Sequence, residues 1–434
     1  MFIAIVYHID ESNPPLTVKI NRDIIQSVNC KSWVVNGGVM TQIAFAQDLA
    51  IARRDEMTYD LLVKGGKVVD PSQGLNAVRD VALSDGKIAA IEENITETSA
   101  REIVDATDLI VTPGLIDLHV HAFWGATAYG MEPDIGNITK GVTTALDTGS
   151  AGASNFLAFR RYVLERSDTR LFALLNISAM GMIWPRIGEL TDIRWADVQE
   201  AVRVGRENRD LVLGIKARLS RGYAGENDLE ALKRTIEAAE AIDGFVMIHV
   251  KDTKTPLEEI TAMLRPGDVV THAFHGKSEG VLDNAGRVID RFREDQQRGV
   301  IFDIGHGSGS FSFRVAEKAL AQDFLPDNIS SDLYNSNVEG PVFDQVTTLS
   351  KFLWLGMPLY EVIRRSTETT ARIMGLEDGL GTLKVGAEGD VTILRLDEGK
   401  FTLTDSEHVS VEARQKLNHV RTIKSGRIYR PWLK

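Results

Sequence analysis

The chain has 434 residues, of which 43% are hydrophobic and 25% charged, with a net charge of -12 at pH 7 and a pI near 5.3. This acidic balance, with no block rich in lysine and arginine, argues against a surface that binds nucleic acid. No run of about 18 apolar residues occurs, so we expect no membrane-spanning helix. The single cysteine, Cys30, excludes an internal disulfide and favours the cytoplasm.

The first 56 residues differ from the rest, because they lack the regular alternation that begins at Met57. Their apolar opening, residues 1–7, is short and has no basic flank, so it makes a poor signal peptide. Met57 can itself start translation. We therefore interpret residues 1–56 as an N-terminal extension, either disordered or a start-site artefact, in preference to a functional module.

Residues 113–376 show alternating strand and helix patterns. Eight short apolar segments have the length and composition of buried parallel strands, at residues 114–121, 143–148, 171–178, 211–217, 245–250, 269–274, 300–305 and 328–333. The segments between them carry apolar residues at helical spacing, as in residues 228–242. This pattern predicts an α/β fold, a (β/α)8 TIM-like barrel.

The two flanks of this region, residues 57–112 and 377–434, are rich in strand patterns and glycine. A helical pattern occurs in them only around residues 410–417. We predict that the flanks form one small, discontinuous β-sandwich domain, which the barrel interrupts.

A histidine pair lies on the first predicted strand of the barrel. His119 and His121 are two residues apart, and residues i and i+2 of a strand share a face. The two imidazoles can therefore bind one metal ion together, although such a pair alone is a weak signal.

Four further polar residues interrupt apolar strands near their carboxyl ends: Lys216, His249, His272 and Asp332. Catalytic side chains of barrel enzymes lie at this end of different strands. Taken singly, each histidine fits a satisfied core position, the lysine a structural ion pair and the aspartate a helix cap. An unpaired buried lysine is costly, and all four residues share this placement, so together they favour a functional site.

These residues resemble the amidohydrolase superfamily of metal-dependent hydrolases over residues 58–434, with the motifs PGLIDLHVH at 113–121 and GTLKVGAEGDVTIL at 381–394. GIKARLS at 214–220 and GHGSGSF at 305–311 are similar to the dihydroorotase-like deacetylase subgroup. The resemblance implies two divalent metals, usually zinc. It assigns one metal to His119, His121 and Asp332, the other to His249 and His272, and a bridging carbamate, formed from carbon dioxide, to Lys216.

The same resemblance implies a hydrolase that acts on ester or carbon–nitrogen bonds. By this resemblance, a metal-bridging hydroxide would attack the carbonyl, and Asp332 would pass the proton to the leaving atom. We expect a deacetylase that cleaves an acyl ester or amide of a small carboxylate-bearing compound, either an O-acetyl α-hydroxy acid such as acetyl-mandelate or an N-acyl amino acid. The alternatives are a cyclic amidase of the hydantoinase or dihydroorotase type and, more remotely, a non-catalytic oligomeric scaffold.

Dihydroorotases resemble this chain but carry an arginine directly after the paired histidines, which holds the substrate carboxylate. Residues 122–125, Ala-Phe-Trp-Gly, lack it, so dihydroorotase itself is disfavoured. Candidate substrate contacts are side chains near strand ends and in the glycine-rich segment: Arg218, His275, His306, Ser308, Tyr129 and Trp184. Each has an alternative: Arg218 can pair with a loop acid, residues 306–310 can form a flexible loop, and the aromatic side chains can simply pack.

A single-metal deaminase of the same superfamily is disfavoured, because such enzymes resemble a pattern without the bridging lysine. We expect a small-molecule substrate and a homo-oligomer, with no nucleic acid and no membrane among the partners.

Overall fold

The computed structural model describes residues 33–36, 39–42 and 58–430. The chain divides into two units, residues 1–58 and residues 59–434. In the first unit, β1 (Trp33–Asn36) and β2 (Val39–Gln42) form an antiparallel pair. The other residues of the predicted extension, with Cys30, lie outside the described residues.

The second unit contains a parallel sheet that carries the candidate site. Its strands are β8 (Leu115–Val120), β9 (Val142–Gly152), β10 (Arg170–Asn176), β11 (Val212–Arg218), β12 (Phe245–His249), β13 (Val269–Thr271) and β14 (Ile301–Phe302). They pair in chain order, from β8 at one edge to β14 at the other, and every pairing is parallel. Seven of the predicted strands are therefore confirmed.

The eighth predicted strand, residues 328–333, is not a regular strand. It makes two isolated parallel bridges, from Asn328 to Asp303 and from Leu333 to Val120. These bridges lie next to β14 and within β8, so the segment contacts both edges of the sheet and gives it a TIM-barrel-like arrangement.

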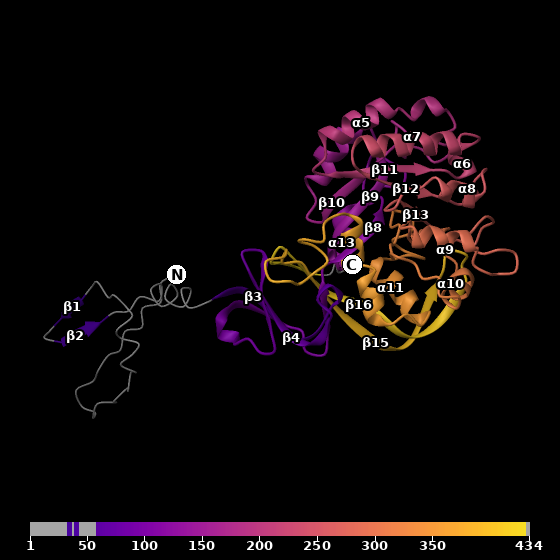
Figure 1. The fold of residues 1–434 in the computed structure, drawn as a ribbon. Helices are drawn as coiled ribbons and strands as arrows, with labels where there is room; N and C mark the ends of the chain where they lie inside the picture. Colours follow the sequence, from indigo (N-terminus) through magenta and orange to yellow (C-terminus); the bar gives the residue numbers. More distant parts are fainter. Residues whose placement is uncertain (1–32, 37–38, 43–57, 431–434) are drawn as a thin grey trace. The chain divides into compact units, whose positions relative to one another are not determined.

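Helices follow most strands, and Figure 1 shows α7 beside β11. The helices are α3 (Pro133–Gly136), α4 (Phe156–Phe159), α5 (Val198–Glu207), α6 (Arg221–Ala224), α7 (Asp228–Ala241), α8 (Leu257–Ala262), α9 (Asp290–Gln297), α10 (Phe313–Leu320), α11 (Gln345–Trp354), α12 (Leu359–Arg364) and α13 (Glu368–Ile373). The prediction of a helix at 228–242 is confirmed by α7, which buries Ala231, Leu232, Thr235, Ala238 and Ala239 on one face. No helix among the described residues has the length and apolar character needed to cross a membrane.

Strands from both flanks join a second, mixed sheet. They are β3 (Tyr59–Asp70), β4 (Leu75–Ser84), β5 (Lys87–Glu92), β6 (Ala100–Asp105), β7 (Ile110–Pro113), β15 (Val391–Thr404), β16 (Ser410–Lys424) and β17 (Arg427–Tyr429). The order is β17-β16-β15-β7-β3-β4-β5, and β6 pairs with β3. The two flanks meet where β7 pairs with β15.

The helix predicted around residues 410–417 is wrong, because these residues begin β16. They pair with β15 along their length. The Leu417 amide also donates to Ser350 Oγ of α11 at 3.0 Å, a typical hydrogen-bond distance. Tertiary pairing therefore overrides the local helical spacing.

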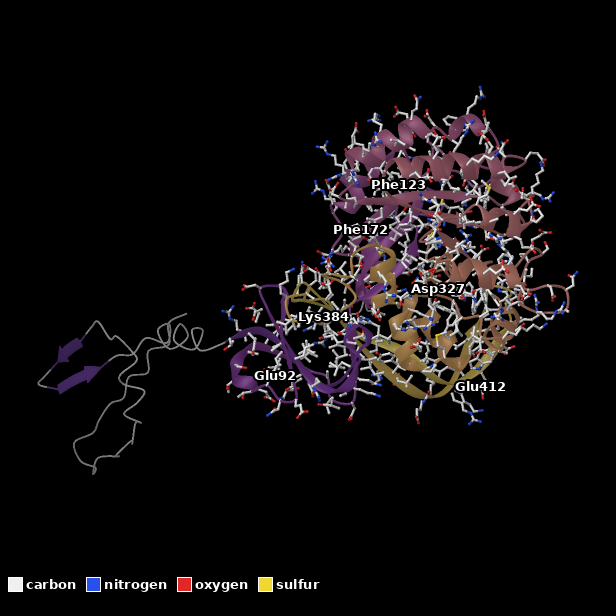
Figure 2. The ribbon with its side chains drawn as sticks, viewed as in Figure 1. Glu92, Phe123, Phe172, Asp327, Lys384 and Glu412 are labelled. Atoms are coloured by element: carbon white, nitrogen blue, oxygen red, sulfur yellow. The ribbon has the colours of Figure 1, made fainter. Side chains whose placement is uncertain are left out.

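The two sheets are connected directly before the candidate site. β8 follows β7 after Gly114, whose amide donates to Asp390 O just ahead of β15. On the other edge, Asp327, which is labelled in Figure 2, accepts from the Phe302 amide of β14 at 2.8 Å. These contacts hold the start of β8 and the segment that leads to Asp332 in fixed positions.

Candidate metal centre

The six predicted metal-site residues come together at the carboxyl ends of the parallel strands. Five of them line one cavity of about 60 Å³: His119, His121, Lys216, His249 and Asp332. His272 joins them through its Nε2, which lies 2.8 Å from His249 Nδ1. Residues separated by up to 213 positions thus form one cluster because parallel strands end at the same edge of the sheet.

The paired histidines of β8 converge on one carboxylate oxygen. His119 Nε2 lies 3.3 Å and His121 Nε2 lies 3.2 Å from Asp332 Oδ1. Ligand atoms of His119, His272 and Asp332 all lie within 4.8 Å of one another. Asp332 is therefore part of the cluster, and the alternative of a helix cap does not apply.

Hydrogen bonds to the outer ring nitrogens set the orientation of two imidazoles. Thr271 Oγ1 donates to Asp303 Oδ2 at 2.7 Å, so this hydroxyl accepts from His119 Nδ1 at 2.9 Å. His272 Nδ1 donates to Gly305 O at 2.6 Å. Both Nε2 atoms then carry no proton, and their lone pairs point into the cluster. An imidazole nitrogen in this state can bind a metal ion.

Asp303 is the buried anchor of this arrangement. Its carboxylate also accepts from Ser330 Oγ at 2.8 Å and from Asn328 Nδ2 at 3.1 Å, and burial raises its pKa to about 6. It connects β13 to the segment that carries Asp332, without contributing to the cavity wall.

We expect Asp303→Ala to weaken divalent-metal affinity by about 10- to 100-fold, the usual cost of losing a group that orients a ligand. The reason is that Thr271 loses its acceptor and can then turn its hydroxyl proton toward His119. Competition with a chromophoric chelator measures the affinity. Unchanged affinity in a folded variant would contradict the orienting role.

Lys216 is fully buried on β11, and within residues 58–430 its Nζ has no hydrogen-bond partner and no ion pair. Burial lowers its pKa to about 7. Gly149 makes room for it: with φ +87°, a Cβ there would lie 2.8 Å from Lys216 Cβ. The alternative of a structural ion pair is therefore wrong, and an unpaired buried amine needs another partner.

His119, His249 and His272 are uncharged at neutral pH. Burial, together with the neighbouring Lys216, holds the pKa of His119 and His272 well below its usual range, and burial beside His272 does the same for the pKa of His249. Neutral imidazoles are the form that binds metal ions.

Two residues of the cluster have unusual backbone conformations. His272 and Asp332 have φ values of +68° and +48°, in the left-handed region. Such strain costs on the order of 1–3 kcal/mol per residue and gathers at functional sites. Gly307 contacts this region, because a Cβ there would lie 2.3 Å from Asp332 Oδ2. The backbone thus gives up stability to orient these two side chains toward the cluster.

Of the predicted substrate contacts, some line the cavity and others do not. Tyr129 lines the cavity, and so does Arg218. Arg218, however, forms a buried two-bond pair with Glu189, at 2.5 and 2.7 Å, which is the alternative that the sequence left open. Trp184 is 54% exposed and does not line the cavity.

The remaining candidates lie outside the cavity wall. Ser308 donates its amide to Tyr334 Oη at 3.2 Å, and the buried His275 accepts at Nδ1 from the Lys277 amide at 3.2 Å. His306 is buried, and its Nε2 lies 2.7 Å from Nζ of Lys351 on α11. Residues 309 and 310 are the part of the glycine-rich segment that lines the cavity.

Lys351 makes stability depend on pH. Burial lowers its pKa to about 7, whereas an unfolded lysine has a pKa of about 10.4. Between these values the unfolded state binds more protons, so the Lys351 contribution makes the free energy of unfolding rise with pH. We expect Lys351→Met to flatten this rise in urea titrations at pH 7 and 9. Lys400→Met, at an exposed position, is the control, and an unchanged slope in Lys351→Met would contradict the expectation.

Sequence reasoning missed Lys251, Tyr223 and Tyr334, which also line the cavity. Two of them carried a usable signal, because Lys251 and Tyr334 lie two residues after His249 and Asp332. The same i, i+2 rule that identified the histidine pair applies to the extended residues beyond a strand. Tyr223 lies in α6, the short helix that follows β11, and carried no such signal.

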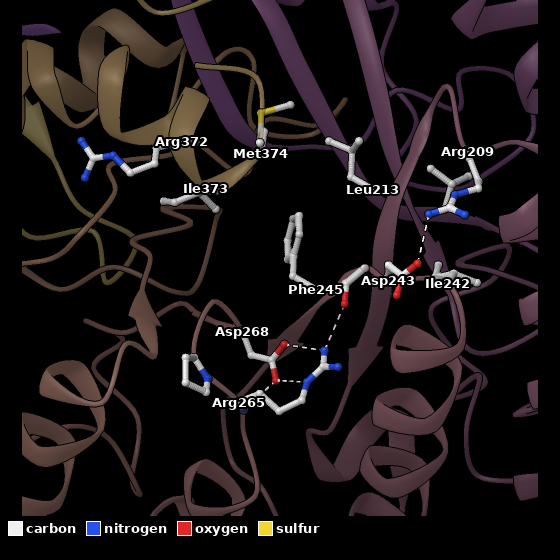
Figure 3. Close-up of a pocket in the computed structure, with 14 residues that line it drawn as sticks. Arg209, Leu213, Ile242, Asp243, Phe245, Arg265, Asp268, Arg372, Ile373 and Met374 are labelled. Atoms are coloured by element: carbon white, nitrogen blue, oxygen red, sulfur yellow. Dashed lines mark hydrogen bonds and ion pairs between the residues drawn. The ribbon is translucent and has the colours of Figure 1, made fainter. Parts of the chain in front are cut away.

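A larger cavity, of about 500 Å³, lies near the starts of β11, β12 and β13 and contains none of the site residues (Figure 3). Its three arginines are already paired: Arg265 with Asp268 at 2.8 Å, Arg209 with Asp243 at 3.2 Å, and Arg372 with Glu368. Because functional sites of this architecture lie at the opposite ends of the strands, size alone does not identify the site.

The clustered side chains fit divalent cations. Neutral imidazole nitrogens and a carboxylate converge, and two buried polar atoms, Lys216 Nζ and His249 Nε2, have no hydrogen-bond partner among the described residues. A metal supplies the missing partner for such a donor set.

Comparison with known proteins agrees with this geometry. A family model described as "Amidohydrolase family" matches residues 352–430. The chain is 36% identical over 379 residues to a deacetylase of Enterococcus faecalis, covering 86% of this chain and 100% of the relative. A solved structure of an adenine deaminase has 36% identity and a TM-score of 0.79, covering 86% of this chain and 100% of that chain. A solved dihydroorotase has 32% identity and a TM-score of 0.79, covering 85% and 97%.

The family generally uses divalent metals, in agreement with the histidine and aspartate cluster. The match to the deacetylase covers most of both chains at 36% identity, which indicates a common family and not only a common fold. This chain belongs to the amidohydrolase family and is a hydrolase of that family.

Proposed function

We propose that this protein is a metal-dependent deacetylase that cleaves an acetyl ester or amide of a small carboxylate-bearing compound. The observation that carries the proposal is the buried Lys216, whose Nζ has no hydrogen-bond partner in the described part of the chain and which lies among the metal-site residues lining the cavity. The long match to a protein named deacetylase supports the choice of reaction.

Two divalent metals, zinc by preference, would be held by two groups of residues: His119, His121 and Asp332 for one, and His249 and His272 for the other. The lowered pKa of Lys216, about 7, leaves much of its amine neutral, which is the form that combines with carbon dioxide. The resulting carbamate would give both metals a shared anionic ligand. When bound, the metals would polarise the substrate carbonyl and lower the pKa of water.

Asp332 would act as the proton carrier. Its Oδ1 lies between the Nε2 atoms of His119 and His121, and its Oδ2 faces Gly307. A carboxylate in this position can take the proton from the attacking water and deliver it to the departing oxygen or nitrogen. Its left-handed backbone fixes the direction in which the carboxylate points.

Aromatic side chains would shape the substrate pocket. Tyr129, Tyr223 and Tyr334 line the cavity, and the rings of Tyr129 and Tyr334 meet edge to face at 5.2 Å. The Arg218 guanidinium stacks on Tyr223 at 3.6 Å and fixes this ring. Such a wall suits a small acid with an apolar or aromatic group.

We also propose the finer architecture. The segment 328–333 would complete a (β/α)8 barrel, and residues 57–112 with 377–434 would form a separate β-sandwich domain. The bridges from this segment to both sheet edges, and the pairing of β7 with β15, support this reading. A homo-oligomer remains our expectation.

The relatives carry different names, so the chain's own residues must choose between reactions. The absence of an arginine in residues 122–125 disfavours a dihydroorotase, and a lysine available as a bridge disfavours a single-metal deaminase. A cyclic amidase is the second candidate, favoured by the dihydroorotase match.

Hydrolysis of a substrate panel tests the proposal. Metal-loaded protein supplied with bicarbonate would be given acetyl-mandelate, N-acetyl amino acids, dihydroorotate, hydantoins and adenine. Release of acetate from the acyclic compounds is the expected result. Ring opening alone would identify a cyclic amidase, and release of ammonia from adenine would identify a deaminase.

A further inference from the structure

We propose that Lys251 is the residue that selects carboxylate-bearing substrates, by pairing with the substrate carboxylate at the cavity wall. This inference rests on the proposed function and deepens it. Lys251 lies two residues beyond His249, the last residue of β12, and lines the cavity with it.

The charges around the cavity single out this residue. The basic side chains that line it are Lys216, Arg218 and Lys251, and the acidic one is Asp332. Glu189 neutralises Arg218 through two hydrogen bonds, and both side chains are buried. Asp332 lies between two imidazoles. Arg218 is therefore not available to pair with a substrate carboxylate.

Lys251 differs from Arg218 in its partners, and burial lowers the pKa of its ammonium. Among the described residues, its ammonium forms no ion pair, and its one hydrogen bond is a long one of 3.4 Å, from Nζ to Gly309 O. The side chain is half-buried, so water solvates the ammonium only in part. A carboxylate that enters the cavity would supply the missing anion and a shorter, charge-assisted hydrogen bond.

The surroundings define the rest of the ligand. Tyr223 and Tyr334 supply apolar ring surface on the wall that Lys251 shares, while Lys216 marks the metal end of the same cavity. A substrate that spans both features has its carboxylate near Lys251 and its acyl carbonyl near the metal-site residues. O-acetyl α-hydroxy acids and N-acetyl amino acids have this form, and their neutral amides lack the anion.

The test compares Lys251→Met with Lys251→Arg and with Lys254→Met. Lys254, three residues on, pairs with Glu226 at the surface and lies outside the cavity wall, so it is the matched control. A hydrogen bond to a charged group contributes about 1.5–3 kcal/mol, which predicts a rise in KM of about 10- to 150-fold for acetyl-mandelate in Lys251→Met. The KM for acetyl-mandelamide should change less than about 2-fold, and Lys251→Arg should recover most of the loss.

Calorimetric binding of mandelate and mandelamide to the metal-loaded protein provides a readout independent of turnover. If the wild type binds mandelate through Lys251 but hydrolyses nothing in the panel, the proposed function fails and this inference stands. If hydrolysis occurs and Lys251→Met lowers both ligands' affinities equally, or neither, the inference fails and the function stands. If mandelate does not bind and acetyl-mandelate is not hydrolysed, both the proposed function and the role of Lys251 are overturned.

Discussion

Replacement of Lys216 by alanine is expected to remove bound metal together with activity. The variant takes away the side chain that we propose as the shared anionic ligand, so metal affinity should fall by more than the 10- to 100-fold expected for an orienting residue such as Asp303. A short carboxylate added in solution should restore part of both, because the space beside Gly149 then admits a substitute anion. Metal content after gel filtration, measured with and without the carboxylate, gives the answer.

Lys351→Met is a matched control, since Lys351 is equally buried but lies outside the cavity wall. It should keep its metal. Full metal content in Lys216→Ala, with activity that no added carboxylate improves, would remove Lys216 from the metal site.

The second large effect is expected for Asp332→Asn. The substitution keeps the shape of the side chain, and asparagine tolerates the left-handed conformation at φ +48° about as well as aspartate. The fold and much of the metal should therefore be retained, while kcat falls by about 10²- to 10⁴-fold because the amide cannot carry the proton. Rates at saturating substrate and metal content of the same samples provide the measurement.

Asp303→Ala separates this effect from weakened metal binding. That variant should regain activity as the metal concentration is raised, since Asp303 contacts Thr271 and not the cavity. Asp332→Asn should gain nothing from added metal. A near-normal kcat in Asp332→Asn would show that another group carries the proton.

The local sequence carries the strand pattern of the barrel region, and seven of its eight strands follow it. Apolar segments of four to eight residues, separated by helical patterns, leave few alternatives to a parallel sheet. The eighth segment differs because its backbone turns into the left-handed region at Asp332 and its side chains replace the ladder: Ser330 Oγ and Asn328 Nδ2 bond to Asp303. Period alone cannot predict such side-chain bonding.

The strand pattern was enough to predict which six residues meet at the candidate metal centre, because polar groups at the ends of parallel strands lie along the same edge of the sheet. Which of the neighbouring charged side chains are already paired could be seen only in the folded structure. Glu189 reaches Arg218 from a loop 29 positions away, and Lys351 of α11 reaches His306 from 45 positions away. Pairing of this kind depends on how distant elements pack. The same dependence explains why residues 410–417 form a strand and why Lys251 has no ion pair among the described residues.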